Sequence, residues 1–245
     1  MARIGVIADI HSNYTALDKV LEHNALAGLE LISPGDIVGY GPRPAEVVDR
    51  LRQLDIQSVK GNHEAAVLGD EKIFQTMRSE ARKVVGWTRK RLDAGQQRFL
   101  SLFPVNLNTD FYSCYHGSPR RPLLEYVDNP SAVASALREE PEVNCLALGH
   151  VHKPLCWVGE SVDSMKRLKI EYGETISFSG QRILFNPGSI GQPRDGDPRA
   201  SFAILDEQEQ TVTWHRVEYD VEETARRIRL AQLPPFLASR LSSGR

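Results

Sequence analysis

Two histidines separated by a single valine, His150 and His152, follow the apolar run LALG at residues 146–149. Side chains at positions i and i+2 of an extended strand point to the same face, so both imidazoles would project together. This is how a strand offers two nitrogens to a metal ion. This stretch alone leaves a second interpretation open, in which one histidine is hydrogen-bonded and the other is exposed where a loop begins.

Residues able to bind a metal follow four other predicted strands. They are Asp9 and His11 in ADIHSN, Asp36 in PGDIVGYG, Asn62 and His63 in GNHE, and His116 in YHGSP. Because open α/β sheets place ligand sites at the carboxyl ends of their strands, we expect these side chains to meet in one crevice. The crevice would contain five of the seven histidines. The other two, His23 and His215, are expected at surface or ordinary hydrogen-bonded positions.

The residue types in this set indicate the chemistry. Imidazole nitrogens with carboxylate and carbonyl oxygens, and no thiolate, suit Mn²⁺, Fe, Zn²⁺ or Ni²⁺ better than Ca²⁺ or a closed structural zinc. Seven candidate ligands are too many for one ion, and one aspartate can bridge, so they fit two ions roughly 3.5 to 4 Å apart. Such a pair activates a bridging water as hydroxide and neutralises phosphate oxygens. We therefore predict phosphoester hydrolysis.

The elements that would position these residues alternate between strands and helices. Buried strands are predicted near 3–9, 29–33, 56–61, 111–116 and 145–150, and helices near 11–24, 44–54, 71–92 and 131–140. This alternation predicts an α/β fold with a partly parallel sheet covered by helices.

The last third of the chain has a different pattern. Segments 175–186, 200–206 and 211–217 are predicted strands without intervening helices, with a hairpin turn at 206–210, so we expect a second, antiparallel layer there. A terminal helix is predicted over 221–231 and a loose tail over 241–245. We expect one domain over 1–245, with the helical segment 65–105 beside the site.

Composition excludes several classes of protein. The formal net charge of −2 over 245 residues argues against a dedicated nucleic-acid surface. We find no signal peptide and no apolar stretch long enough to span a membrane, which predicts a cytoplasmic protein. Three cysteines without C-x-x-C spacing indicate small buried hydrophobes rather than a disulfide framework or a thiolate zinc site. The sequence shows no heptads from which an oligomeric state could be inferred.

The motifs together resemble the signature of the calcineurin-like metallophosphoesterase superfamily. D-x-H, G-D, G-N-H-[ED], H and G-H-x-H occur in order over residues 9–152, and FNPGSIGQPRDGDPRASF is similar to the segment that follows in small prokaryotic members. The resemblance implies a two-layered mixed β-sandwich flanked by α-helices. It also implies two sets of metal ligands, one of Asp9, His11, Asp36 and His152, the other of Asn62, His116, His150 and the bridging Asp36. His63 would bind no metal and would contact phosphate or act as general acid.

One departure from the family pattern bears on the substrate. Protein Ser/Thr phosphatases read G-D-x-V-D-R-G, whereas this chain has Gly39 and Tyr40 in place of the aspartate and arginine. This favours the branch similar to bacterial phosphodiesterases and dinucleoside polyphosphate hydrolases. Arg194 is a candidate for the missing positive charge, with a surface-loop arginine as the alternative, and Asn13 and Tyr40 are further candidate substrate contacts. Three arginines fall on one face of the predicted helix over 71–92 and could attract a polyanion: Arg78, Arg82 and Arg89. A solvated helix face is the simpler explanation for them.

We therefore expect a metal-dependent phosphoesterase that uses two divalent transition metal ions, Mn²⁺ first among them, and acts on a phosphorylated, nucleotide-like small molecule. A phosphomonoesterase, including a protein phosphatase, is the nearest alternative. A non-catalytic scaffold is a third, because the superfamily is similar in fold to the retromer scaffold subunit. The intact set of ligands argues against the scaffold, which has no need of a buried cluster of histidines and carboxylates.

Overall fold

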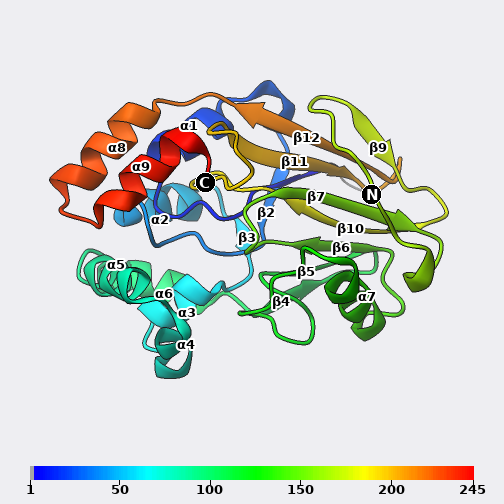
Figure 1. The fold of residues 1–245 in the computed structure, drawn as a ribbon, viewed down its shortest axis with the longest axis horizontal. Coiled ribbons are helices and arrows are strands. Elements are labelled where there is room, and N and C mark those ends of the chain that lie inside the picture. The colour runs from blue at the N-terminus through cyan, green and yellow to red at the C-terminus, as the bar shows by residue number, and fades with distance from the viewer. Residues whose placement is uncertain (1–2) are drawn as a thin grey trace.

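The computed structural model describes residues 3–245, in which two mixed six-stranded sheets pack face to face with helices on their outer sides (Figure 1). The first sheet has the order β3-β2-β1-β11-β12-β9. Its strands are β1 (Arg3–Val6), β2 (Glu30–Ser33), β3 (Gln57–Ser58), β9 (Thr175–Ser177), β11 (Ala200–Asp206) and β12 (Thr211–Val217). The first three are parallel to one another, and β11 joins β1 antiparallel, with Ile4 opposite Leu205.

The second sheet has the order β4-β5-β6-β10-β7-β8. Its strands are β4 (Asn106–Asn108), β5 (Tyr112–Tyr115), β6 (Cys145–Leu148), β7 (Pro154–Gly159), β8 (Lys166–Arg167) and β10 (Arg182–Pro187). Strands β5, β6 and β10 run parallel, and α7 (Pro130–Glu139) packs Val133 and Leu137 against the outer face of this sheet. The predicted α/β sandwich flanked by helices is confirmed.

Apolar side chains from both sheets share one core. Val6 of β1 and Trp214 of β12 lie in the same buried cluster as Cys145 of β6 and Phe185 of β10. The indole of Trp214 also donates a hydrogen bond across the sandwich to the Asn186 carbonyl at 2.9 Å. Alternation of side chains along each strand places these residues inward, while α1 (Tyr14–Leu21) and α2 (Pro44–Gln53) bury a separate cluster on the outer face of the first sheet.

The late strands do not form a layer of their own, so that prediction was wrong. Strand β10 inserts between β6 and β7 of the second sheet, where Ile183 lies opposite Cys145. Strands β11, β12 and β9 instead extend the first sheet from β1. Strands from the last third of the sequence therefore complete both sheets. Strand β11 pairs with the free edge of β1, and β10 pairs with the free edge of β6.

The helical region also departs from its prediction. A single helix over 71–92 was expected, but the structure has α4 (Glu71–Thr76) and α5 (Ser79–Arg89), separated by extended backbone at Met77 and Arg78. They lie between α3 (Asn62–Val67) and α6 (Ala94–Ser101) along the chain. Apolar side chains of this segment are buried all the same, since Ile73, Met77 and Val85 pack into the cluster beneath these helices.

The end of the chain is helical and not a loose tail. The predicted helix is present as α8 (Val221–Leu230), and it is followed by α9 (Pro235–Ser243), which we did not predict. Leu237 and Leu241 of α9 are buried against Val84 of α5. Two short 3-10 turns complete the elements, η1 (Asn24–Leu26) and η2 (Val162–Ser164).

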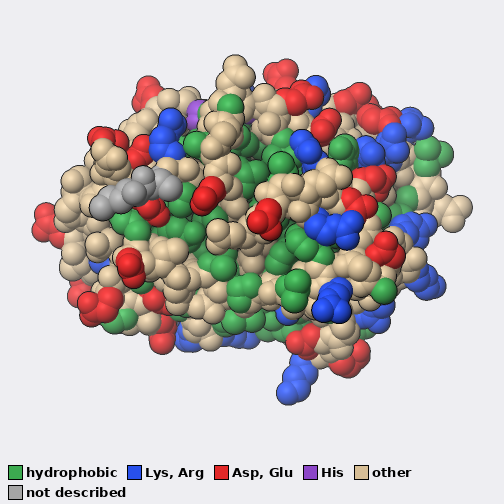
Figure 2. Space-filling model, turned by 180° about the vertical axis from the view of Figure 1, so that it is seen from behind, with side chains coloured by type: hydrophobic (Ala, Val, Ile, Leu, Met, Phe, Trp, Pro, Cys, Tyr) green, Lys and Arg blue, Asp and Glu red, His purple; other side chains and the backbone are tan. Residues whose placement is uncertain are grey.

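The described part of the chain contains no helix with both the length and the apolar character that crossing a membrane requires. On the face opposite to the view of Figure 1, acidic and basic side chains are interspersed (Figure 2). This distribution agrees with the small net charge of the sequence.

Candidate metal centre and its cavity

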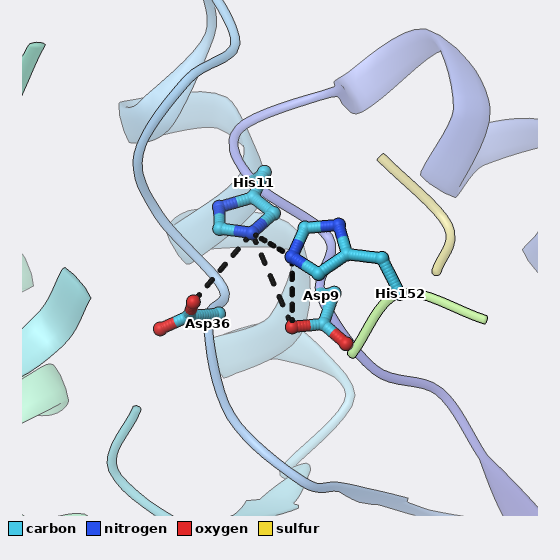
Figure 3. Close-up of side chains that lie close together, drawn as sticks. All are labelled: Asp9, His11, Asp36 and His152. Atoms are coloured by element: carbon cyan, nitrogen blue, oxygen red, sulfur yellow. Dashed lines mark hydrogen bonds and ion pairs between the residues drawn. The ribbon is translucent and has the colours of Figure 1, made fainter. Parts of the chain in front are cut away.

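One group of four buried side chains lies where the loops after β1, β2 and β6 meet (Figure 3). The group consists of Asp9, His11, Asp36 and His152, whose ligand atoms all lie within 4.8 Å of one another. The Nε2 atoms of His11 and His152 are 3.1 Å apart, and Nε2 of His11 is 3.5 Å from Oδ2 of Asp36. The structure thus brings together residues that are up to 143 positions apart in the sequence (from Asp9 to His152).

The hydrogen bonds of the two histidines leave their inner nitrogens without protons. Nδ1 of His11 donates to the Val38 carbonyl at 3.1 Å, and Nδ1 of His152 donates to the Gln192 carbonyl at 2.7 Å. Burial lowers the pKa of both imidazoles well below the usual range, so each Nε2 presents a lone pair. Two facing lone pairs repel each other unless a cation lies between them, and Oδ2 of Asp9 is buried without a partner. These donors fit a divalent metal ion.

A second group shares Asp36 with the first. It contains Asp36, His116 and His150, and the Asn62 amide joins it, since Oδ1 of Asn62 is 3.0 Å from Nε2 of His116. That nitrogen also lies 3.0 Å from Nδ1 of His150 and 3.3 Å from Oδ2 of Asp36. Burial opposes charge on His116, but the Asp36 and Asp9 carboxylates outweigh it and raise its pKa to about 9. In this group, too, the arrangement favours a positive charge.

The backbone at the candidate ligands is strained. Five of them have φ between 47° and 68°, a region that non-glycine residues rarely adopt: Asp9, His11, Asp36, His150 and His152. Each such residue costs on the order of 1 kcal/mol or more and persists only where the surrounding structure holds it. Strain gathered on one set of polar side chains is typical of a functional site.

Glu64 holds the Asp36 loop in place, a role that the sequence analysis missed although GNHE includes this residue. Its buried carboxylate accepts hydrogen bonds from the backbone N–H groups of Asp36, Val38 and Gly61 at 2.8 to 2.9 Å. Burial, and then the charge of Asp36, raise the pKa of Glu64 to about 7. The residue touches no reacting group, and it positions the aspartate that both ligand groups share.

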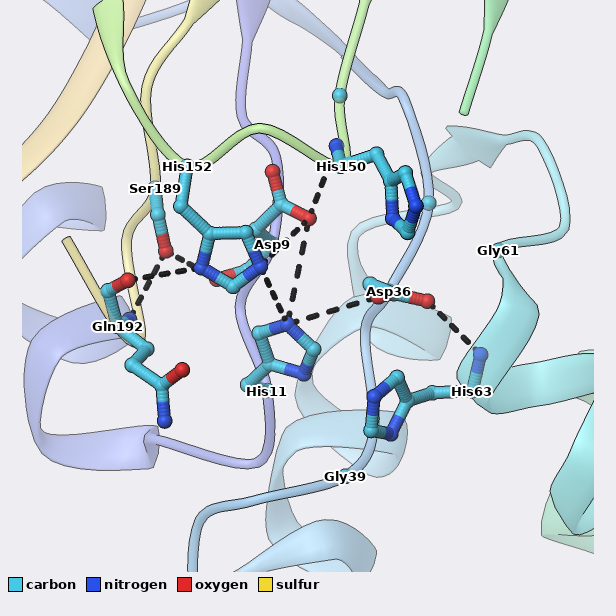
Figure 4. Close-up of polar contacts among 12 residues, drawn as sticks. Asp9, His11, Asp36, Gly39, Gly61, His63, His150, His152, Ser189 and Gln192 are labelled. Atoms are coloured by element: carbon cyan, nitrogen blue, oxygen red, sulfur yellow. Dashed lines mark hydrogen bonds and ion pairs between the residues drawn. The ribbon is translucent and has the colours of Figure 1, made fainter. Parts of the chain in front are cut away.

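Ser189 and Gln192 were missed as well, and both support the first group (Figure 4). The Ser189 hydroxyl donates to the Asp9 carbonyl at 2.8 Å and accepts from the Gln192 backbone N–H at 2.9 Å. The Gln192 carbonyl in turn orients His152. These residues follow β10 at the same sheet edge as the candidate ligands, so applying the strand-end rule to the late strands would have found them.

His63 lies outside both ligand groups and borders them. Its backbone N–H donates to Oδ1 of Asp36 at 3.0 Å, and its ring packs on Tyr40, with ring centroids 4.5 Å apart. Nδ1 of His63 is buried without a partner and faces Gly39, where a Cβ atom would overlap it. The absence of an aspartate at position 39 therefore leaves this imidazole unsupported by a carboxylate and closely covered by the glycine backbone.

A cavity of about 740 Å³ opens above the site and is lined by His63, His150 and Asn62. Tyr40 and Arg194, two of the predicted substrate contacts, also line it. Both Nε and Nη2 of Arg194 donate to Oε1 of Gln192, at 3.2 and 2.8 Å. Burial raises the pKa of the Tyr40 hydroxyl, which keeps its proton available for donation.

Asn13, the third predicted substrate contact, does not line this cavity. Its Oδ1 accepts from the Ala16 N–H and the Thr224 hydroxyl, and its Nδ2 donates to the Gly191 carbonyl. The side chain is buried and caps α1, so we assign it a role in the fold.

The three arginines predicted on one helix face have different surroundings in the structure. Only Arg78 lines the cavity, whereas Arg82 contacts Gln75 and Arg89 donates to the carbonyls of Ala66 and Val67.

His23 and His215 lie outside the ligand groups, as predicted. Nδ1 of His23 accepts from the Ala25 N–H, and the two rings pack together with centroids 5.0 Å apart.

Comparison with known proteins identifies the family. Residues 2–210 match the family described as the calcineurin-like phosphoesterase superfamily domain. Uncharacterized protein MJ0912 of Methanocaldococcus jannaschii is 35% identical over 248 residues, covering 99% of this chain and 98% of that protein. Phosphodiesterase YfcE of Escherichia coli (strain K12) is 25% identical over 217 residues, covering 84% and 88%.

A solved structure agrees with these matches over the whole chain. The metallophosphoesterase from Sphaerobacter thermophilus superposes with a TM-score of 0.89 at 37% identity, covering 100% of this chain and 99% of that one. Metal dependence is general in this family, and the buried Asp and His groups provide suitable ligands. From the motifs, the fold and these matches, the chain belongs to the calcineurin-like phosphoesterase superfamily.

Proposed function

We propose that the protein hydrolyses phosphodiester or nucleotide-type substrates with two divalent metal ions, Mn²⁺ first among the candidates. The observation that carries this proposal is the pair of buried donor groups joined by Asp36, of which Asn62 and His150 reach the wall of one cavity. Asp9, His11, Asp36 and His152 would hold one ion, and Asp36, Asn62, His116 and His150 the other. Bound there, the ions would supply Lewis acidity to phosphoryl oxygens and lower the pKa of a bound water.

The residues around the ions would act on the substrate directly. His63 lies next to Asp36 and faces the cavity, where it would donate a proton to the leaving oxygen. The Arg194 guanidinium and the Tyr40 hydroxyl would hold non-bridging phosphate oxygens. Gln192 fixes Arg194 through its side chain and His152 through its carbonyl, so it ties the phosphate contact to the ligand geometry.

The cavity wall supports a nucleotide-like ester as the proposed substrate. Tyr126 stacks on His150 with ring centroids 3.9 Å apart, yet 51% of its surface remains exposed at the cavity wall. An exposed aromatic face beside a phosphate site favours a planar base or aryl group. A dinucleoside polyphosphate is one member of this class. A protein phosphatase is less well supported, because positions 39 and 40 are Gly39 and Tyr40 in place of the charged pair of that branch.

The test is hydrolysis by chelator-stripped protein reloaded separately with Mn²⁺, Ni²⁺, Zn²⁺ or Mg²⁺. We expect restored turnover with a higher kcat/KM for bis-p-nitrophenyl phosphate than for p-nitrophenyl phosphate. Preference for the monoester would support the phosphatase alternative. A lack of turnover with every metal would contradict the enzymatic proposal and favour the scaffold.

Two variants separate the proposed roles in the same assay. Asp36→Asn should abolish turnover and weaken binding of both ions, because its carboxylate belongs to both groups. His63→Ala should retain both ions and lose roughly 10²- to 10⁴-fold in kcat, most severely for poor leaving groups. Loss of bound metal in His63→Ala would show that the acid role is wrong.

A further inference from the structure

The cavity carries more positive charge than the reacting phosphate requires. Four guanidinium groups line it, and the only carboxylate among its lining residues is that of Glu80; the arginines are Arg78, Arg121, Arg194 and Arg240. They come from separate parts of the fold. Arg78 lies in the extended break between α4 and α5, Arg121 follows β5, Arg194 follows β10, and Arg240 is on α9.

Over residues 3–245, none of these four arginines forms an ion pair with an aspartate or glutamate side chain. Elsewhere in the fold such pairs are common, as in Arg216 with Asp195 and Asp197 and in Arg227 with Glu223. Of the cavity arginines, Arg194 contacts the Gln192 amide and Arg240 the carbonyl of Arg245. Glu80 and Glu125 interact with Arg78 and Arg121 only at longer range. Four guanidinium groups around one hollow, without a carboxylate side chain in direct contact, attract an anion from solution.

The mutual repulsion of these groups points to the same conclusion. Burial, and then the charges of Arg194 and Arg78, lower the pKa of Arg240, with Tyr40 acting in the opposite direction. A bound phosphate would relieve this repulsion and accept hydrogen bonds from the guanidinium fork.

The positions of the arginines divide the cavity into two parts. Arg194 follows the loop that supports the ligand His152, so it belongs with the metal centre. Arg78 and Arg240 belong to the helical wall, where Leu237 and Leu241 pack α9 against Val84 of α5. The family match ends at residue 210, so Arg240 on α9 lies outside the matched residues, whereas Arg78 lies within them.

We propose that Arg78 and Arg240 form a distal anion subsite that binds a second phosphate group of the substrate while the first reacts at the metal centre. The substrate would then be a phosphodiester or nucleotide bearing at least one additional phosphate. This inference rests on the proposed phosphoester hydrolysis in the same cavity and names the substrate class more narrowly.

The test uses two esters with the same leaving group and the same scissile bond. They are thymidine 5′-(p-nitrophenyl phosphate) with and without a 3′-phosphate. In the metal-loaded wild type, we expect a higher kcat/KM for the bisphosphate. The ratio of the two kcat/KM values should fall about ten-fold in Arg78→Gln and in Arg240→Gln, because each loses a charged hydrogen-bond donor. Arg167→Gln removes the same charge from exposed β8 and should keep the wild-type ratio.

A binding measurement distinguishes failure of the subsite from failure of the proposed function. Calorimetry on the chelator-stripped full-length chain compares thymidine 3′,5′-bisphosphate with thymidine 5′-phosphate, after melting curves have shown that each variant is folded. Tighter binding of the bisphosphate that is weakened in Arg78→Gln and Arg240→Gln would support the subsite even if no ester were hydrolysed. Equal affinity of the two nucleotides for the wild type, or a wild-type preference retained in both variants, would overturn it.

Discussion

At the scale of single residues, the site depends on positions where no side chain can be accommodated. Gly39 has a φ of +98° and packs directly against the imidazole of His63. A Cβ atom there would overlap Nδ1, Cγ and Cε1 of the ring, so the ring would have to move. Gly39, which stands where the protein phosphatase pattern has an aspartate, therefore sets the position of His63, the proposed acid.

We expect Gly39→Ala to retain both metal ions and to lose kcat by at least ten-fold, because it displaces His63 without altering a ligand. The matched control is Gly69→Ala, which has a φ of +103° but no atom within 4 Å of the new Cβ. Both substitutions place alanine in a strained conformation and should cost on the order of 1 kcal/mol of stability. Equal activity of the two variants, measured with metal content by elemental analysis, would contradict the role of this contact.

Residue types and spacing predicted the side chains that meet at the site, but not the residues that support these side chains through hydrogen bonds. The predicted metal ligands, Asp9 to His152, are recognisable because imidazole and carboxylate side chains recur after strands. Glu64 and Ser189 act through backbone N–H and carbonyl groups, which every residue possesses. Asn13, predicted as a substrate contact, is a helix cap in the structure, a role that its residue type does not distinguish from a substrate contact.

At the scale of elements, α3 presents both Asn62 and His63 from its first turn and has only six residues. A helix this short has few hydrogen bonds of its own and depends on its neighbours. Ala66 and Val67 form the carboxyl end of α3. Their carbonyls accept hydrogen bonds from the guanidinium of Arg89, on α5, at 2.7 Å and 2.8 Å. This contact anchors α3 from the end opposite to the site.

Arg89→Ala should lower the free energy of unfolding by about 2 kcal/mol, because it leaves two helix-end carbonyls without their charged donor. It should also lower kcat a few-fold, since α3 carries His63. Arg98→Ala, at an exposed position of α6, should change stability by less than about 0.5 kcal/mol. Urea denaturation and steady-state kinetics on both variants measure these effects. Unchanged stability in Arg89→Ala would show that the carbonyls are satisfied by other means.

Local sequence patterns predicted the positions of strands and helices better than they predicted which strands pair with one another. Most predicted strands and helices are present, because hydrophobic periodicity reflects burial of one face or both. The choice of sheet for β10 and β11 depends on which edge is free in three dimensions, which no local pattern records. The helix α9 follows Pro234 and begins at Pro235, and this pair of prolines is typical of a break, although Pro235 suits a first helical turn.

At the scale of the whole molecule, the two halves of the site depend on the two sheets. The first sheet carries Asp9, His11 and Asp36 after its strands, and the second carries His116, His150 and His152. Separation of the sheets would therefore dismantle both ligand groups. The shared core, in which Trp214 donates across the sandwich to the Asn186 carbonyl, opposes such separation. We propose that residues 1–245 form one domain and unfold as one cooperative unit.

The three cysteines of the second sheet test this proposal. Burial raises the pKa of Cys156 to about 12 and those of Cys114 and Cys145 above their usual values, so the native thiols should resist iodoacetamide at pH 8. In an unfolded chain, a thiol pKa of about 8.5 would allow rapid reaction. Along a urea series, we expect all three thiols to become reactive at the midpoint seen by circular dichroism, with Trp fluorescence changing at the same concentration. Labelling well below that midpoint would mean that the second sheet opens alone and that the chain has two folding units.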